Sequence, residues 1–261
     1  MNHPNRTAIV TGAAQGIGRR TAELLAENGY AVALVDLRAA SAVSAALREK
    51  GAAVIDFRGD ISHEATVTDF AAKIEREWGH IDLLVNNAGI SCISPAEETS
   101  VQQFRRVLEI NLTAPFLLAK TFGPKMIARR QGSIVNVASI AGLVGIADRT
   151  AYNASKHGLI GLTRTLAAEW GGRGVRVNAV CPGWVKTEMD AADQSSGGYT
   201  DDDIVHRIPM ARFASPSDIA EAILFLADDR RGGFVNGHTL VVDGGWTSDG
   251  SWESLRLRHR G

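Results

Sequence analysis

Tyr152 and Lys156 stand four residues apart in a segment with helical periodicity. Because positions i and i+4 share one face of a helix, the phenol and the ammonium can meet over the edge of one bound molecule. A cation beside a phenol stabilises the phenolate and pulls its pKa, ordinarily about 10, toward neutral. The pair could then act as a general base in alcohol oxidation or as a general acid in the reverse direction. The plainer interpretation is a surface helix that carries both side chains for no catalytic reason.

Two further side chains could assist this pair. Ser139 comes at the end of a predicted strand, so its hydroxyl should emerge at the sheet edge near Tyr152 and could hydrogen-bond the reacting oxygen. Asn111 lies in a predicted helix, and Pro115 four residues later has no N–H, so the Asn111 carbonyl should lack its helical partner. A water on that carbonyl could lead protons from Lys156 to solvent. A turn serine and a packing kink are the plainer interpretations.

The glycines at 12, 16 and 18 follow the first predicted strand and lead into a helix. Glycines let backbone N–H groups approach a pyrophosphate, and the N-terminus of a helix favours negative charge. The spacing Gly-x3-Gly-x-Gly is not the GxGxxG pattern of the standard dinucleotide motif, and glycines also cluster in ordinary turns. We expect a phosphate site here.

Asp36 ends the second predicted strand, 18 residues after Gly18, near the offset at which a carboxylate binds an adenosine ribose. A capping or solvated aspartate is the alternative. A 2′-phosphate beside Asp36 would be repelled by about 4 kcal/mol at ~4 Å and an effective dielectric of about 20. The sequence therefore predicts NAD rather than NADP, although Arg38 could offset part of the repulsion and leaves NADP open.

The cofactor also bears on the catalytic pair. The positive ring of oxidised nicotinamide would reinforce the effect of Lys156 on the pKa of Tyr152.

Seven short apolar runs alternate with segments of helical periodicity. Most are apolar at successive positions, which is typical of strands buried on both faces of a parallel sheet. We therefore expect an α/β fold of the doubly wound, Rossmann-like type, with seven parallel strands, helices on both faces, and the functional residues at the strands' C-terminal ends. The predicted strands are 8–10, 31–37, 53–57, 81–85, 133–137, 176–180 and 239–242.

No linker or composition break divides the chain, so we expect one catalytic domain over residues 1–261. Residues 184–216 are rich in Gly, Ser and Asp and interrupt the alternation, which predicts a substrate lid. Residues 246–261 extend beyond the last strand as a tail with two tryptophans. Trp246 and Trp252 could dock on a neighbouring subunit; a frayed end is the other interpretation.

Taken together, the order and spacing of these motifs resemble the short-chain dehydrogenase/reductase family over nearly the whole chain. The resemblance is carried by Thr11-Gly12-x3-Gly16-x-Gly18, Asn86-Asn87-Ala88-Gly89, Asn111, Ser139, Tyr152-x3-Lys156, Pro182-Gly183 and Val242-Asp243-Gly244-Gly245. It implies that Tyr152 exchanges the proton, Lys156 tunes it and binds the nicotinamide ribose, Ser139 orients the substrate and Asn111 supports a water relay.

The resemblance also implies a set of cofactor contacts and a homotetramer. Asp60 and Ile61 would touch the adenine, Asn87 and Ala88 the ribose, and residues 182–187 the nicotinamide end. The full set is Gly12, Gln15, Gly16, Ile17, Gly18, Asp36, Leu37, Asp60, Ile61, Asn87, Ala88, Gly89, Tyr152, Lys156, Pro182, Gly183, Val185 and Thr187.

Composition excludes several other classes of protein. The chain has 261 residues and a net charge of −1, which gives no electrostatic reason to expect nucleic acid or an anionic membrane as partner. Cys92 and Cys181 are too few for a disulfide framework and lack the CxxC spacing of a zinc site, so we expect no metal and read both as packing residues. No signal peptide precedes the first strand, and no segment is apolar enough to span a bilayer. A cytoplasmic protein with a small-molecule partner is expected.

These features predict an NAD-dependent oxidoreductase that transfers a hydride between nicotinamide and a secondary alcohol or carbonyl of a small neutral molecule. A sugar, polyol or cyclic alcohol is favoured, because the acidic lid would disfavour phosphate-bearing acyl carriers or CoA esters. The alternative is an NADP-dependent 3-oxoacyl-thioester reductase, since the motifs also resemble that branch. A catalytically inactive homologue that senses dinucleotide ranks below both, because Asn111, Ser139, Tyr152 and Lys156 are all present.

Overall fold

The chain forms a parallel sheet of seven strands in the order β3-β2-β1-β4-β5-β6-β7. The computed structural model describes residues 6–194, 199–252 and 255. The predicted fold is confirmed, and each predicted strand is present with ends shifted by at most two residues. The strands are β1 Thr7–Thr11, β2 Ala31–Asp36, β3 Val54–Arg58, β4 Leu83–Asn86, β5 Gly132–Val137, β6 Val175–Pro182 and β7 Thr239–Val242.

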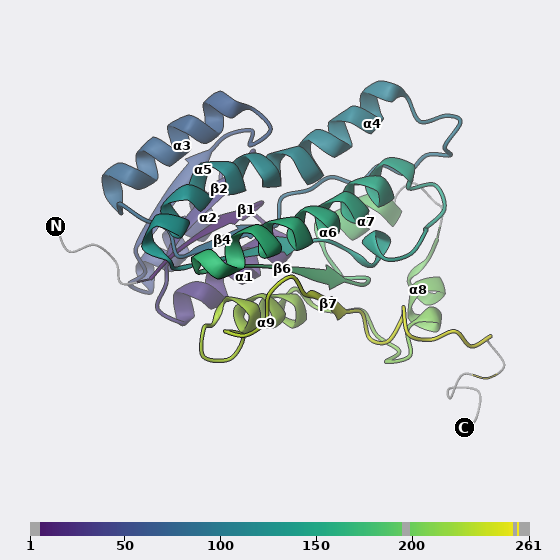
Figure 1. Cartoon of the computed structure of the whole chain (residues 1–261). Helices are drawn as coiled ribbons and strands as arrows, with labels where there is room; N and C mark the ends of the chain where they lie inside the picture. The colour runs from purple at the N-terminus through teal and green to yellow at the C-terminus, as the bar shows by residue number, and fades with distance from the viewer. Residues whose placement is uncertain (1–5, 195–198, 253–254, 256–261) are drawn as a thin grey trace.

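Helices cover both faces of the sheet, as Figure 1 shows. Neighbouring residues of one strand point to opposite faces, so Val10 packs in one apolar layer and Ile9 in the other. The first layer is completed by α1 (Gly16–Glu27), α2 (Ser41–Glu49) and α9 (Pro216–Ala227). The second is completed by α3 (Glu64–Glu77), α5 (Ala114–Arg129) and α6 (Thr150–Trp170). Both faces are buried, which explains why the strands read as continuous apolar runs.

Strand order reverses between β1 and β4, and in a doubly wound sheet this is where ligands bind. β1 pairs with β2 on one side and with β4 on the other. The loops that leave β1 and β4 therefore diverge and open a crevice at the C-terminal edge of the sheet. The glycine-rich turn and the segment after Asn86 both begin at this edge.

The segment predicted as one interrupted helix consists of three pieces. Helix α4 (Val101–Leu108) runs into a π-helical turn, η1 (Glu109–Thr113), and then into α5. Pro115 occupies the first turn of α5, where its missing N–H is tolerated. The interruption expected beside Asn111 thus takes the form of a π-turn that contains Asn111 itself.

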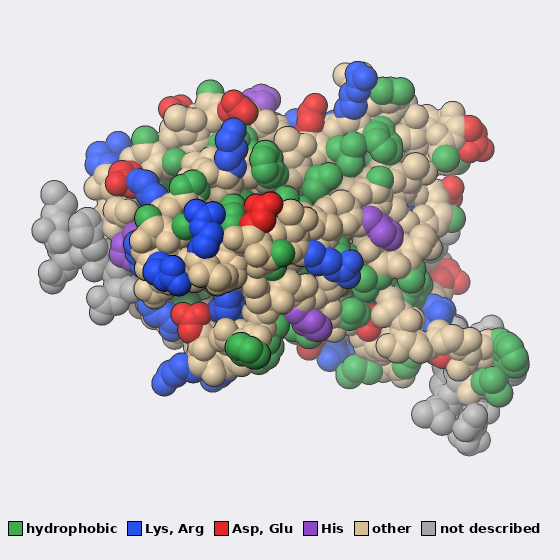
Figure 2. Space-filling model, viewed as in Figure 1, with side chains coloured by type: hydrophobic (Ala, Val, Ile, Leu, Met, Phe, Trp, Pro, Cys, Tyr) green, Lys and Arg blue, Asp and Glu red, His purple; other side chains and the backbone are tan. Residues whose placement is uncertain are grey.

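The predicted lid carries two short helices, α7 (Glu188–Gln194) and α8 (Asp201–Arg207), and its residues 195–198 lie outside the described part. Shorter 3-10 turns are η2 (Ile140–Gly142) and η3 (Gly171–Arg173). Within residues 6–194, 199–252 and 255, no helix combines the length and apolar character needed to cross a bilayer. On the face drawn in Figure 2, acidic and basic side chains are interspersed.

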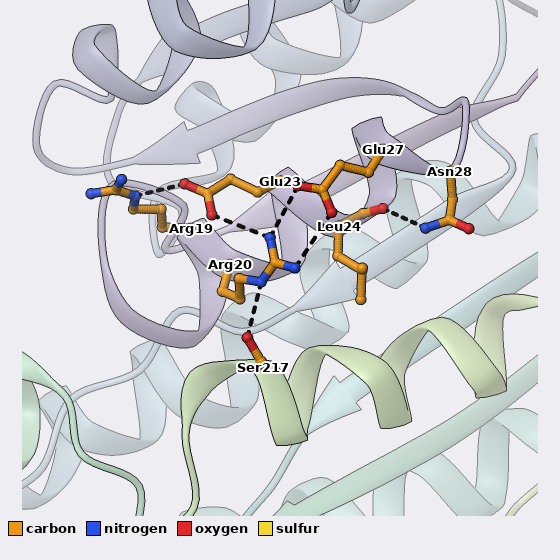
Figure 3. A network of polar contacts seen from close by, with 7 residues as sticks. All are labelled: Arg19, Arg20, Glu23, Leu24, Glu27, Asn28 and Ser217. Carbon is orange, nitrogen blue, oxygen red and sulfur yellow. Dashed lines mark hydrogen bonds and ion pairs between the residues drawn. The ribbon is translucent and has the colours of Figure 1, made fainter. Parts of the chain in front are cut away.

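Helix α1 is tied to the start of α9 by a polar network drawn in Figure 3. Arg20 donates to the Ser217 hydroxyl at 3.0 Å and pairs with Glu23 and Glu27 of its own helix. Arg19 pairs with the other carboxylate oxygen of Glu23 at 2.8 Å. Such exposed pairs contribute little stability, about 0 to 1 kcal/mol each, so the packing beneath them holds the two helices together.

Candidate active site

The glycine-rich turn brings β1, α1 and the end of β4 closer together than side chains would allow. Gly12 has φ +67°, and a Cβ there would stand 2.9 Å from the Ala88 Cα. A Cβ on Gly18 would stand 2.1 Å from the Gly12 carbonyl oxygen. Gly18 therefore acts in helix–strand packing and does not line the crevice, unlike the other cofactor residues that the resemblance implied.

The N-terminus of α1 offers its N–H groups to a ligand. Gln15 caps the helix without a side-chain hydrogen bond, and no acidic residue lies in the first turn. Those N–H groups and the helix dipole suit the negative charge of a pyrophosphate. This part of the chain therefore fits a dinucleotide.

Asn87 fastens the glycine-rich turn to β4. Its Nδ2 donates to the carbonyl oxygens of Thr11, at 2.9 Å, and Gly12, at 3.2 Å. The Thr11 hydroxyl in turn accepts from the N–H groups of Asn87 and Ala88, both at 3.0 Å. The motif 86–89 thus holds the turn in place besides lining the crevice. That tie joins residues 76 apart, and the sequence pattern does not reveal it.

Asp36 lies where the sequence places it, at the end of β2 and on the wall of the crevice. Its carboxylate accepts from the Ala14 N–H at 3.0 Å and from the Arg38 N–H at 2.8 Å. The carboxylate therefore also steadies the glycine-rich turn. The exposed Arg38 lines the same wall, as expected for a cation that could soften the repulsion of a 2′-phosphate.

Asp60 forms a polar cluster with Ser62 and Arg106 at the expected adenine end. Arg106 Nη2 donates to the Asp60 carboxylate at 2.6 Å, and Ser62 donates to its other oxygen through its N–H and its hydroxyl. Burial alone would raise the pKa of Asp60, but the hydrogen bonds from Ser62 and Arg106 lower it to about 2. Sequence analysis missed Arg106, which lines the crevice from α4.

Asn111 lies behind the crevice wall and joins the ends of three elements. Its Oδ1 accepts from the Ile90 N–H at 2.9 Å, and its Nδ2 donates to the Ile90 carbonyl and to the Ser155 hydroxyl. A Cβ on Gly89 would stand 3.2 Å from Asn111 Oδ1 and 3.6 Å from Lys156 Nζ, so the glycine makes room for both. The water relay stays a prediction.

Lys156 is buried, with 4% of its surface exposed. Its Nζ donates to the Val137 carbonyl at 2.8 Å and lies 5.5 Å from the centroid of the Tyr152 ring. Burial disfavours the ammonium and lowers the pKa of Lys156 to about 8. The lysine is therefore held firmly beside Tyr152 and is easier to deprotonate than in water.

Tyr152 reaches the crevice from the first turn of α6, next to Ser139 at the end of β5. Burial raises the pKa of Tyr152, and the hydrogen bond with Ser139 and the Arg149 cation act against that rise. The pKa is thus raised in the chain alone, not lowered as the spacing of Tyr152 and Lys156 predicted. The reason is that the ring is surrounded by protein, which disfavours the charged phenolate more than the Ser139 hydrogen bond and the Arg149 cation favour it.

Most of these groups line one cleft of about 350 Å³; Gly18, Ser62 and Asn111 lie outside its lining. It runs from Asp36 and Asp60 past the glycine-rich turn to Ser139, Tyr152 and Lys156. Residues 182–187 of the predicted nicotinamide end border it, except Lys186. Among residues 6–194, 199–252 and 255, no group of three or more His, Cys, Asp or Glu side chains is placed to hold a metal ion. The arrangement can bind a dinucleotide along its length and move a proton at its far end.

Comparisons with known proteins agree with this geometry. Residues 12–247 match the family described as "Enoyl-(Acyl carrier protein) reductase". The chain is 43% identical over 244 residues to D-threitol dehydrogenase of Mycolicibacterium smegmatis, with 93% of both chains covered. It is also 43% identical over 245 residues to cis-4-hydroxycyclohexanecarboxylate dehydrogenase of Sinomonas cyclohexanicum, covering 93% of this chain and 97% of the relative.

A solved structure is similar over the same length. It is described as a putative NAD(P)-dependent gluconate 5-dehydrogenase from Beutenbergia cavernae with bound NADP. The match has a TM-score of 0.88 and 39% identity, and it covers 94% of this chain and 98% of the other. With the fold, the glycine-rich turn and the Ser–Tyr–Lys end of the cleft already in place, the chain belongs to the short-chain dehydrogenase/reductase family.

Proposed function

We propose that this protein oxidises a secondary hydroxyl group of a small neutral sugar, polyol or cyclic alcohol and uses NAD as the hydride acceptor. The observation that carries the proposal is the placement of Ser139, Tyr152 and Lys156 at one end of a cleft whose other end fits a dinucleotide. Relatives of high identity act as dehydrogenases on alcohols. The chain is an NAD(P)-dependent oxidoreductase of CH–OH groups.

Each side chain has a separate part in the reaction. The Ser139 hydroxyl holds the substrate oxygen, and the Tyr152 phenolate, which the positive ring of oxidised nicotinamide would favour over the neutral phenol, accepts its proton as the carbonyl forms. Lys156 supplies positive charge near the phenolate, and Asn111 keeps Ile90 and Ser155 in place behind it. NAD, when bound, supplies the acceptor for the hydride that leaves the carbinol carbon of the substrate.

The choice of NAD over NADP rests on Asp36. Its carboxylate stands at the end of β2 on the cleft wall, where an adenosine ribose is expected. A 2′-phosphate there would meet like charge, partly offset by Arg38. Because one solved relative is described with bound NADP, the preference is tested by comparing kcat/KM for NAD and NADP.

The proposal is tested by mixing the protein with NAD and a panel of sugars, polyols and cyclic alcohols and recording the absorbance of reduced cofactor. We expect turnover with wild type and a loss of kcat of at least about 1000-fold in Tyr152→Phe, with NAD binding retained. Full turnover in Tyr152→Phe would remove the phenol from the mechanism. If wild type binds NAD normally but oxidises no alcohol of the panel, the result would favour the alternative of an inactive homologue that senses dinucleotide.

The second candidate is reduction of a 3-oxoacyl thioester with NADPH; the matching family is described by a different acyl-thioester reduction, that of an enoyl group on acyl carrier protein. The lid argues against it, because six carboxylates lie between residues 188 and 203 against one basic side chain at 186. Acetoacetyl-thioester reduction that far exceeds alcohol oxidation would overturn the first proposal.

We also infer a homotetramer in the cytoplasm, built from single-domain subunits. Large apolar side chains are exposed on several elements, among them Val101 on α4, Phe116 on α5, Phe225 on α9 and Val241 on β7. Side chains of this kind suit burial in subunit contacts. Cys92 and Cys181 are both free, which suits a reducing compartment. The mass in solution tests the assembly.

A further inference from the structure

Arg149 is a charged side chain in the cleft that none of the roles above uses. Its side chain is only 8% exposed, and it stands at the N-cap of α6, three residues before Tyr152. Nη1 donates to the Ser91 hydroxyl and to the Asp193 carboxylate, both at 2.9 Å, and Nη2 donates to the Tyr199 hydroxyl at 3.3 Å. The guanidinium therefore connects the reacting end of the cleft to the lid.

Asp193 supplies the opposite charge from α7. Its side chain is 17% exposed and lines the cleft together with Arg149 and Tyr152. An arginine donates hydrogen bonds and a carboxylate accepts them, so the pair presents both functions side by side. A hydroxyl group needs a donor and an acceptor at once, and the Arg149–Asp193 pair meets that need without net charge.

Two aromatic rings in contact with each other lie beside Arg149. The centroids of Trp184 and Tyr199 are 5.3 Å apart in a T-shaped arrangement, and the Arg149 guanidinium carbon lies 5.6 Å from the Trp184 ring centroid. Such rings give an apolar platform for the C–H groups of a polyhydroxylated molecule, whose hydroxyls point to the polar pair.

The same residues separate the cleft from a second cavity of about 310 Å³. Ile146, Arg149, Trp184 and Tyr199 line both, and Trp246 belongs to the wall of the second cavity alone. Space is thus available past the reacting carbon for the rest of a substrate several carbons long.

We propose that Arg149 and Asp193, beside the rings of Trp184 and Tyr199, form a subsite that binds a second hydroxyl group of a polyol while the neighbouring carbinol is oxidised at Tyr152. This inference rests on the proposed function and narrows its substrate class to compounds with at least two hydroxyls. A substrate carboxylate is disfavoured, because it would face the Asp193 charge and compete for a guanidinium that is already paired. Arg149 and Tyr152 stand three residues apart at the start of α6 and line the same cleft, which places the subsite at the reacting end.

The test uses three substrates with the same four-carbon chain, namely 2-butanol, 2,3-butanediol and 3-hydroxybutanoate, each assayed with NAD. For wild type we expect kcat/KM for the diol to exceed that for 2-butanol by at least about 100-fold, and 3-hydroxybutanoate to be the poorest. Asp193→Asn should lower kcat/KM for the diol about tenfold or more, mainly through KM, and change the value for 2-butanol by less than about threefold.

Asp202→Asn is the matched control, because it removes one lid charge from an exposed position on α8 that borders neither cavity. Asp202→Asn should leave kcat/KM for all three substrates at the wild-type value. Thermal unfolding of both variants checks that they fold. Equal kcat/KM for diol and mono-alcohol, or an equal loss of both in Asp193→Asn, would overturn the subsite while leaving the proposed oxidation intact. A higher kcat/KM for 3-hydroxybutanoate than for the diol would overturn the proposal that the subsite binds a neutral polyol and would favour a hydroxy acid as substrate. No oxidation of any alcohol by wild type would end the proposed function and the subsite together.

Discussion

At the scale of single residues, the active site depends on two charged side chains that hydrogen bonds hold in place, the half-buried Asp36 and the buried Lys156. Asp36 stands on the cleft wall and holds the glycine-rich turn through the Ala14 N–H. Lys156 stands beside Tyr152 with its ammonium fixed on the Val137 carbonyl. Each group therefore has a structural contact as well as a proposed chemical role, and a useful variant must separate the two.

Asp36→Asn separates them for the cofactor, because the amide loses the negative charge and keeps one oxygen that can accept from the Ala14 N–H, at the loss of the hydrogen bond from the Arg38 N–H. We expect the ratio of kcat/KM for NADP to that for NAD to rise at least about tenfold, since the repulsive element against a 2′-phosphate is gone. Both efficiencies are measured by steady-state kinetics on one alcohol. An unchanged ratio would place the discriminating charge elsewhere than at Asp36.

Lys156 makes a prediction about stability and pH. Burial lowers the pKa of Lys156 from 10.5 to about 8, so between these values the unfolded chain binds a proton that the folded chain does not. The free energy of unfolding should therefore rise with pH across this window, by about 3 kcal/mol in total for this group. Below pH 8 both states are protonated and the contribution is constant.

The measurement compares urea unfolding of wild type and Lys156→Met from pH 7 to about 10.5. We expect the difference between the two proteins to grow with pH in favour of wild type, because other titrating groups cancel in the comparison. A constant difference would mean that the lysine keeps its ordinary pKa in the folded chain. The variant should also lose activity at every pH.

At the scale of elements, the closeness of α1 to β1 is the feature on which the dinucleotide end depends. A Cβ on Gly18 would stand 2.1 Å from the Gly12 carbonyl oxygen and 2.5 Å from Asn87 Nδ2. Gly18→Ala must therefore push the helix away from the turn, which should cost about 1 to 3 kcal/mol and raise KM for NAD.

Gly161→Ala is the matched control for this substitution, because Gly161 is also helical, on α6, and its Cβ would meet nothing within 4 Å. It should be neutral or stabilise the protein by up to about 1 kcal/mol, since alanine favours a helix over glycine. Thermal or urea unfolding of Gly18→Ala and Gly161→Ala measures the change in the free energy of unfolding for each variant. Equal behaviour of the two alanine variants would contradict the packing argument.

The elements also show what the sequence could predict and what it could not. The strands were predictable because burial on both faces requires runs such as Ala31–Val35, and the break near Asn111 followed from Pro115. The form of that break, a π-turn, depends on packing that no local pattern records. Likewise Arg106 meets Asp60 across 46 residues and Arg149 meets Asp193 across 44, so only the folded chain reveals these partners.

At the scale of the whole molecule, the C-terminal tail closes onto the lid of its own chain. The Arg207 guanidinium lies 5.0 Å from the Trp246 ring centroid and donates to the Asp249 carbonyl at 2.9 Å. Trp246 therefore has a partner on α8 in the same chain, and docking of Trp246 and Trp252 on a neighbouring subunit stays a prediction. Trp252 is 72% exposed, and residues 253–254 and 256–261 of the predicted tail lie outside the described part.

This arrangement assigns different tasks to the two tryptophans. Trp246 lines the cavity beyond Arg149, so Trp246→Ala should raise KM for the alcohol severalfold through a looser α8, with KM for NAD and the oligomeric mass unchanged. Trp252→Ala is the control and should leave KM for the alcohol at the wild-type value. Substrate kinetics and mass in solution are measured on both variants. A lower mass in Trp246→Ala would return this ring to a subunit contact, whereas a lower mass in Trp252→Ala alone would assign that contact to the exposed ring and leave Trp246 to the lid.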